Sequence, residues 1–166
     1  MNKVFFDLEW NTGFLDGNSF DEIIEIGAVK TDEEYRQIDG FRRLIRPVIY
    51  RKMNPYIQKI LAITMKDLQG EEPLAAVAKV FFDWCGDCDT LIAWSGNDFG
   101  VLEKNLAHIG MKIPEQLGRY DVQMAYAYRT ENSIRNYALK TAVEAMELPE
   151  PEGQEYHDAY CDAQFT

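Results

Sequence analysis

The sequence predicts a single domain of the α/β class. Three apolar runs in the first third of the chain, near residues 3–10, 22–30 and 41–46, are followed by the glycine, aspartate or proline residues that end strands. Farther along, helical patterns alternate with a fourth apolar run, 90–94. Strands followed by alternating helices and strands are typical of an α/β fold, and 166 residues with 46% apolar side chains are enough for one core.

Helix-start signals follow the third predicted strand. A helix near 55–61 begins at a proline, and Thr64 with Asp67 resembles a capping box that starts a short further turn. Pro73 is expected as the first residue of a helix that continues through Trp84. These signals predict three helical segments between the third and fourth strands.

The second half of the chain is predicted to be mainly helical. Asp98 opens a helix with one apolar face, formed by Phe99, Leu102 and Leu106. The stretch 132–148 is the clearest amphipathic pattern and predicts one continuous helix. The stretch 149–153 has no apolar periodicity, and we expect it to form a mobile loop.

Two carboxylates lie inside the first predicted strand. Asp7 and Glu9 are two residues apart, so their side chains project from the same face. The strand is expected to be buried because its other residues are apolar, among them Phe5, Phe6, Leu8 and Trp10. Adjacent buried charges are costly unless they are paired or coordinated, and oxygen ligands suit Mg²⁺ or Mn²⁺ better than Zn²⁺. The pair therefore predicts phosphoryl transfer assisted by two metal ions about 4 Å apart.

Three further candidate site residues lie far away in the sequence: Asp98, His157 and Asp162. Taken singly, Asp98 is a first-turn acid, His157 a loop histidine and Asp162 an exposed helix acid. Their significance comes from their spacing and their company.

Together these residues resemble the motifs of the DEDD exonucleases of the DnaQ-like type, over essentially the whole chain. Asp7 and Glu9 match the Asp-x-Glu at the end of the family's first strand, and Asp98 matches the aspartate that opens a helix after a strand. His157 and Asp162 match the third motif in its histidine form, His-x-x-x-x-Asp. The resemblance implies a ribonuclease H-like fold, in which a five-stranded mixed β-sheet with an antiparallel second strand is flanked by α-helices.

The resemblance also implies an activity. A member of this family would be a metal-dependent 3′→5′ exonuclease that releases nucleoside 5′-monophosphates from the 3′ end of single-stranded RNA or DNA. Asp7 would bridge both metal ions, Glu9 and Asp162 would hold the ion that binds the attacking water, and Asp98 would support the second ion. His157 would accept the proton from that water, for which the ordinary histidine pKa of about 6.5 is suitable.

Residues next to the motifs are candidates for substrate contacts and for helix capping. Trp10, Asn11 and Phe14 follow the first motif, and we expect them to stack on or contact the terminal base, with core or lid packing as the alternative. Asp158 begins the last helix, where capping is a better explanation than metal binding. The chain continues for only four residues after Asp162, so we expect a short C-terminal helix, which is either truncated or a short natural end.

Charge limits the kind of nucleic acid that we expect to bind. The formal net charge of −11 disfavours tight binding to long duplexes, because phosphate binding usually needs a basic surface. The basic residues are grouped: Arg42, Arg43, Arg46, Arg51 and Lys52 form one group, and Arg129, Arg135 and Lys140 a looser one. Either these groups are solvated strand and helix faces, or they form a rim that follows the phosphates.

No apolar run approaches the roughly 18 residues of a membrane span and no signal segment opens the chain, so we expect no membrane association and a cytoplasmic location. Cys85, Cys88 and Cys161 do not form a disulfide framework, and Cys85-Gly86-Asp87-Cys88 is expected at a helix end. Two other functions stay open: a catalytically weak nucleic-acid-binding module, and a phosphodiesterase acting on short oligonucleotides.

Overall fold

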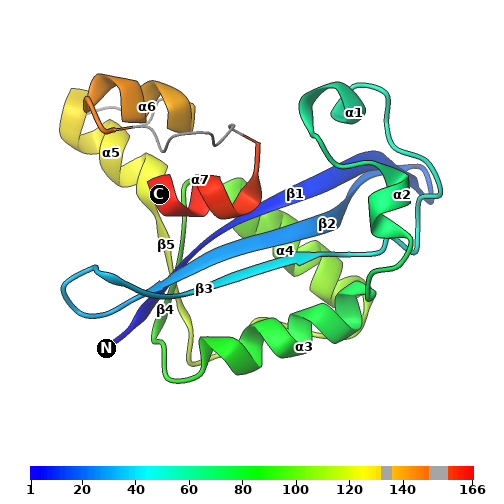
Figure 1. The fold of residues 1–166 in the computed structure, drawn as a ribbon, viewed down its shortest axis with the longest axis horizontal. Coiled ribbons are helices and arrows are strands. Elements are labelled where there is room, and N and C mark those ends of the chain that lie inside the picture. The colour runs from blue at the N-terminus through cyan, green and yellow to red at the C-terminus, as the bar shows by residue number, and fades with distance from the viewer. Residues whose placement is uncertain (132–135, 150–156) are drawn as a thin grey trace.

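A five-stranded mixed sheet forms the centre of the molecule (Figure 1). The computed structural model describes residues 1–131, 136–149 and 157–166. The sheet has the order β3-β2-β1-β4-β5, with antiparallel pairing of β1 with β2 and of β2 with β3, and parallel pairing of β1 with β4 and of β4 with β5. The strands are β1 (Lys3–Leu15), β2 (Asn18–Thr31), β3 (Gln37–Leu44), β4 (Thr90–Ala93) and β5 (Gly118–Asp121). The predicted α/β fold with a five-stranded mixed sheet is confirmed.

The first two strands are longer than the apolar runs that predicted them. They continue past the core as a hairpin, in which Leu15 pairs with Asn18 across a two-residue turn. The turn residues Asp16 and Gly17 have φ of 50° and 82°, the conformation that Asp-Gly turns adopt in tight hairpins. The extension was missed because its residues are largely polar or exposed, and backbone pairing needs no apolar side chain.

Seven helices are described: α1 (Ile57–Ile60), α2 (Met65–Leu68), α3 (Leu74–Cys85), α4 (Gly96–His108), α5 (Val122–Glu131), α6 (Leu139–Ala145) and α7 (Ala159–Phe165). The capping box of Thr64 and Asp67 is confirmed at α2, whereas Pro73 is the N-cap of α3 and not its first residue. All three cysteines are buried and form no disulfide within the described residues, and Cys85 ends α3 as expected. None of the helices in the described ranges is long and apolar enough to cross a membrane.

The continuous helix predicted for 132–148 is wrong. Residues 132–135 lie outside the described part of the chain, 136–138 are not helical, and α6 covers only Leu139–Ala145. The carbonyl oxygen of Tyr137 instead accepts hydrogen bonds from Trp94 Nε1 at 2.9 Å and Gln123 Nε2 at 2.6 Å. Tertiary hydrogen bonds therefore override the local helical pattern. The expected loop 149–153 falls mostly outside the described residues.

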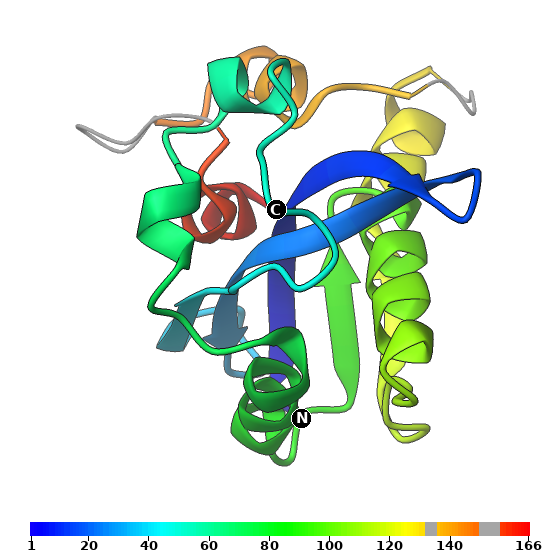
Figure 2. The ribbon, with the colours of Figure 1, turned by 90° about the vertical axis from the view of Figure 1, so that its right-hand side faces the viewer.

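One face of the sheet packs into the main hydrophobic core, and the other carries the two acids of β1. Val4, Phe6 and Leu8 of β1 belong to the main core together with residues of α3 and α4, and the Phe6 ring lies 5.2 Å from that of Phe99. Asn105 ties α4 to β2, because its side chain accepts from the Ile23 amide at 3.2 Å and donates to Asp21. Figure 2 shows α4 running beside β4. The alternate residues of β1, which include Asp7 and Glu9, face the other side.

Helix α7 lies against that other side, across β1 and β2 (Figure 1). Gly27 of β2, which pairs with Asp7, makes this approach possible. A Cβ atom at Gly27 would lie 2.1 Å from the backbone carbon of Ala159 and 2.1 Å from the backbone nitrogen of Tyr160. Helix backbone thus rests directly on strand backbone beside the Asp7 pair.

We expect Gly27→Ala to displace α7, because backbone atoms of a packed helix cannot yield like a flexible side chain. The free energy of unfolding should fall by at least about 1–3 kcal/mol, the usual cost of overpacking. The measurement is chemical denaturation of the two proteins. Gly100→Ala is the control, since no atom lies within 4 Å of its Cβ and α4 should gain up to about 1 kcal/mol. Equal stability of Gly27→Ala and the unaltered protein would contradict the tight packing.

Candidate active site

Strand β1 and helix α4 supply the first three carboxylates. Asp7 and Glu9 project from the α7 face of β1, and the strand register shifts immediately after Glu9. Asp98 lies in the first turn of α4 and is 5% exposed. Its carboxylate accepts a hydrogen bond from the Ser95 hydroxyl at 3.0 Å, and the backbone amide of Leu8, between the two β1 acids, lowers its pKa.

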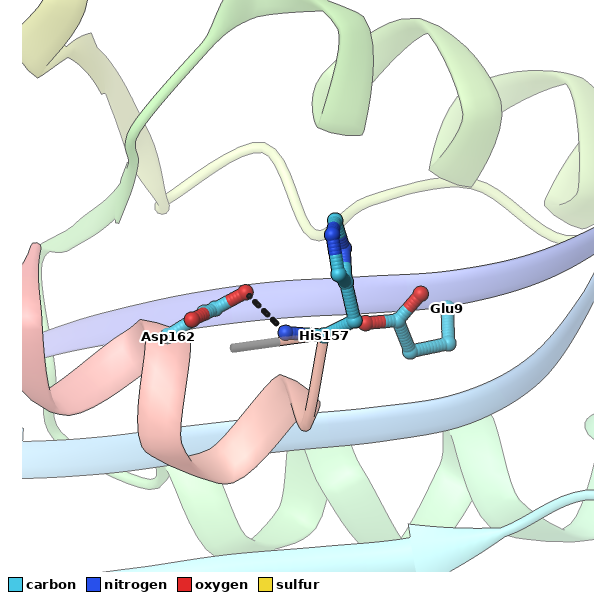
Figure 3. Close-up of side chains that lie close together, drawn as sticks. All are labelled: Glu9, His157 and Asp162. Atoms are coloured by element: carbon cyan, nitrogen blue, oxygen red, sulfur yellow. Dashed lines mark hydrogen bonds between the residues drawn. The ribbon is translucent and has the colours of Figure 1, made fainter. Parts of the chain in front are cut away.

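The start of α7 supplies the remaining two residues (Figure 3). The His157 amide donates to Asp162 Oδ2 at 3.2 Å, and His157 has a φ of 71°, in the left-handed region. Potential metal-ligating atoms of Glu9, His157 and Asp162 all lie within 4.8 Å of one another. Asp158 caps α7 by accepting from the Cys161 amide at 3.1 Å, so its predicted capping role is confirmed.

These residues surround one cavity of about 290 Å³. All five predicted motif residues line it: Asp7, Glu9, Asp98, His157 and Asp162. The rest of the lining is mainly apolar, and we call it the apolar wall. It includes Trp10, Trp94, Leu139 and three residues of the α1 region, Ile57, Ile60 and Leu61. The cavity lining therefore combines acidic and apolar side chains.

Burial raises the pKa of every carboxylate in the cluster, and repulsion by the neighbouring acids adds to the rise at Asp7 and Glu9. Burial is the largest cause at each: it raises the pKa of Glu9 to about 8, and those of Asp98 and Asp162 to about 6. The pKa of Asp7 lies well above its ordinary value because Asp7 is buried and also faces Asp98, Asp162, Glu9 and Glu25. Without a counter-charge, the fold thus disfavours ionisation of all four groups together.

The cluster fits a divalent cation. Among the described residues, Asp162 Oδ1 is buried and has no hydrogen-bond partner, although a carboxylate oxygen in that position needs one. The donor set consists of carboxylate oxygens with one nearby imidazole, which favours a hard cation such as Mg²⁺ or Mn²⁺. Asp7, Glu9, Asp98 and Asp162 are the groups positioned to share its charge.

Two of the three predicted base-contacting residues have other surroundings. Trp10 lines the cavity, where its predicted contact with a base stays a prediction. Asn11 is 1% exposed, and its side chain donates to the Lys52 carbonyl and accepts from the Asn54 amide, so it fastens the segment before α1. Phe14 is 78% exposed on the hairpin extension and does not line the cavity.

The basic groups do not form one rim around the cavity. Among the described residues, no lysine or arginine lines it. Arg42 instead forms ion pairs with Glu25 and Asp158, and Arg46 donates to the Glu71 carbonyl. Arg135 lies outside the described residues. Arg42 is therefore more than part of a solvated strand face, because its guanidinium pairs with two carboxylates of the fold.

Sequence reasoning missed two features of the site. Glu25 is fully buried in β2 beside the cluster, and a charged residue inside the apolar run Ile23-Ile24-Glu25-Ile26 was a signal for it. The apolar wall from α1 had no such signal. The wall depends on Glu22, whose carboxylate accepts from the amides of Val48, Ile49 and Tyr50 and holds the segment that leads to α1.

The raised pKa values predict how metal-free stability depends on pH. Between about pH 4 and 8 the folded state keeps protons that the unfolded chain has released, so the free energy of unfolding should fall as pH rises. Mg²⁺ or Mn²⁺ should reverse the loss and raise the melting temperature more at pH 8 than at pH 5. Asp7→Asn should flatten the pH dependence. A metal-free melting temperature that rises through this range would contradict the repulsion.

The comparisons agree with this geometry. Residues 4–166 match the model of the RNase_T exonuclease family. A PolC-type DNA polymerase III of Clostridium perfringens is 34% identical over 112 residues, which are 66% of this chain and only 7% of that protein. The nuclease domain of 3′hExo, a DEDDh family member bound to rAMP, superposes with a TM-score of 0.79 at 16% identity, covering 99% of this chain and 86% of the other.

E. coli exonuclease I in complex with a dT13 oligonucleotide has the same fold, with a TM-score of 0.73 at 19% identity, covering 99% of this chain and 39% of the other. At such identities the two structures establish the fold. Together with the family match, they confirm the resemblance that the motifs predicted. The chain belongs to the RNase_T exonuclease family.

Proposed function

We propose that residues 1–166 form a single exonuclease domain that releases nucleoside 5′-monophosphates from the 3′ end of single-stranded RNA or DNA. One observation carries the proposal. Five motif residues from three distant parts of the chain line the same cavity: Asp7, Glu9, Asp98, His157 and Asp162. Membership of the exonuclease family supports the same reaction class.

Two divalent ions, Mg²⁺ or Mn²⁺, complete the proposed site. Asp7, Glu9, Asp98 and Asp162 would hold them, and when bound they would supply positive charge to the attacking water and the scissile phosphate. The burial of these carboxylates would strengthen their attraction for the cations, because charges interact more strongly where water screens them less.

His157 has two possible roles in this arrangement. Its ring lies close to Glu9 and Asp162 and is exposed, so it can accept the proton of an attacking water. The same proximity would allow it to bind a metal ion. We assign it the role of general base, because the four carboxylates already provide a full oxygen donor set for hard cations.

The apolar wall is the proposed support for the terminal nucleoside. Trp10 offers an aromatic face, and Ile57 and Leu61 offer aliphatic contacts across the cavity. Contacts of this kind do not read the edge of a base, so we expect weak base preference. Asn11 is not included, because its side chain is already bonded within the fold.

A second substrate class is favoured by the electrostatics. In the described part of the chain the cavity lining contains no lysine or arginine, and the net charge is −11. Such a surface gives little attraction to phosphates beyond the reacting one. A phosphodiesterase acting on dinucleotides or short oligonucleotides therefore remains a candidate. Rates on a dinucleotide and a long strand, each as RNA and as DNA, separate the two functions.

The direct test is degradation of end-labelled single strands in Mg²⁺ or Mn²⁺. We expect a 5′-labelled strand to shorten from its 3′ end, whereas a 3′-phosphate or a circular strand should resist attack. Asp7→Asn is the matched control for contaminating nucleases, because it removes the central charge while preserving shape. Its activity should vanish although it stays folded. Rapid cutting of circles would indicate an endonuclease, and binding without release of mononucleotides would indicate a binding module.

We expect His157→Ala to lower the single-turnover rate by about 10²–10⁴-fold, the usual contribution of a positioned base. Metal affinity, measured by calorimetry, should change little. His108→Ala is the control, since His108 ends α4 and its ring packs 5.5 Å from that of Phe20. A collapse of metal affinity in His157→Ala would make His157 a ligand, and an unchanged rate would remove it from the chemistry.

A further inference from the structure

Glu25 is a fully buried acid that the proposed reaction does not use. It lies on β2 opposite Glu9 and adds to the repulsion that raises the pKa of both Asp7 and Glu9. A fifth carboxylate beside four others works against the fold unless something balances it. The balancing charge comes from Arg42, whose Nε donates to Glu25 Oε1 at 2.8 Å.

Arg42 also reaches the start of α7. Its second guanidinium nitrogen forms an ion pair with Asp158, the residue between His157 and the first turn of the helix. One side chain on β3 therefore connects a buried acid on β2 with the N-cap of α7. The backbone amide of Ala159 acts on the same Glu25 carboxylate, because together with Arg42 it lowers the pKa that burial raises.

We propose that Glu25, Arg42 and Asp158 form a positioning network that fixes the first turn of α7, and with it His157 and Asp162, against Asp7 and Glu9. The proposal rests on the proposed function, because it assigns these residues to the geometry of that reaction. None of the three touches the reacting atoms. They act through His157, which precedes Asp158, and through Asp162 on α7.

The backbone at His157 explains why such a network is needed. A non-glycine residue with φ of 71° is held in a sparsely populated conformation and persists only where its surroundings impose it. On one side of His157 the Asp158 carboxylate is fixed by Arg42 and by the Cys161 amide. The His157 amide is in turn fixed by Asp162. Release of Asp158 from Arg42 would let the imidazole swing away from Glu9.

The test compares Asp158→Asn, Arg42→Met and the double variant. Asparagine caps a helix as well as aspartate, so Asp158→Asn removes the ion pair and leaves α7 capped. In saturating Mn²⁺ on a short single strand, we expect each single variant to lower kcat by about 10–100-fold, as loss of a partner behind a metal ligand does, with KM nearly unchanged. The double variant should lose no more kcat than the less active of the two single variants, because both changes disable the same network. Arg42→Lys should restore part of kcat.

Arg36→Met is the matched control, because Arg36 also pairs with two acids, Asp32 and Glu34, but on the exposed turn between β2 and β3. Its kcat should equal that of the unaltered protein. Circular dichroism at the assay temperature must find every variant folded, and a kcat loss that only follows the unfolded fraction would overturn the positioning role.

Three other outcomes overturn the proposal. Additive losses in the double variant would mean that Arg42 and Asp158 act separately. A raised KM with a weaker salt dependence and an unchanged kcat would make Arg42 a phosphate contact. Full activity of both single variants would leave the network without a role. Inactivity of the unaltered protein would instead count against the proposed function itself.

Discussion

Repulsion among buried carboxylates is the constraint on which the rest of the structure depends. Burial raises the pKa of Asp7, Glu9, Asp98 and Asp162, and the charges of the neighbouring acids raise the pKa of Asp7 and Glu9 further. A chain gains nothing in stability from this arrangement until cations bind. The fold must therefore hold the acids together with interactions made elsewhere.

Those interactions come from both faces of the sheet. On one face, Phe6 packs against α3 and α4, which fixes β1 and the helix that carries Asp98. On the other face, the absence of a side chain at Gly27 lets the backbone of α7 rest on β2, opposite Asp7. The first contact belongs to the main hydrophobic core. The second is short and depends on close contact, so its position needs additional polar anchors.

Pairing of charges within the fold also limits the positive charge that a substrate would meet. Arg42, which lies beside the N-terminus of α7, forms ion pairs with two carboxylates of the fold, Glu25 and Asp158. The apolar wall of the cavity includes residues of α1, and the side chains of Glu22 and Asn11 hold the segment that leads to α1 through hydrogen bonds to its backbone. Recognition in such a site would rest on cations at the reacting phosphate and on apolar contact with one nucleoside.

The sequence by itself determined the α/β class, the positions of the main strands and the five motif residues, because strand burial and motif spacing are local properties of the chain. Only the tertiary structure decided the ends of β1 and β2, the interruption of the predicted helix at Tyr137, and the burial of Asn11. It also decided the partners of Glu25 and Arg42, which are 17 residues apart. Hydrogen bonds and ion pairs between distant elements select these features, and no local pattern of side chains encodes them.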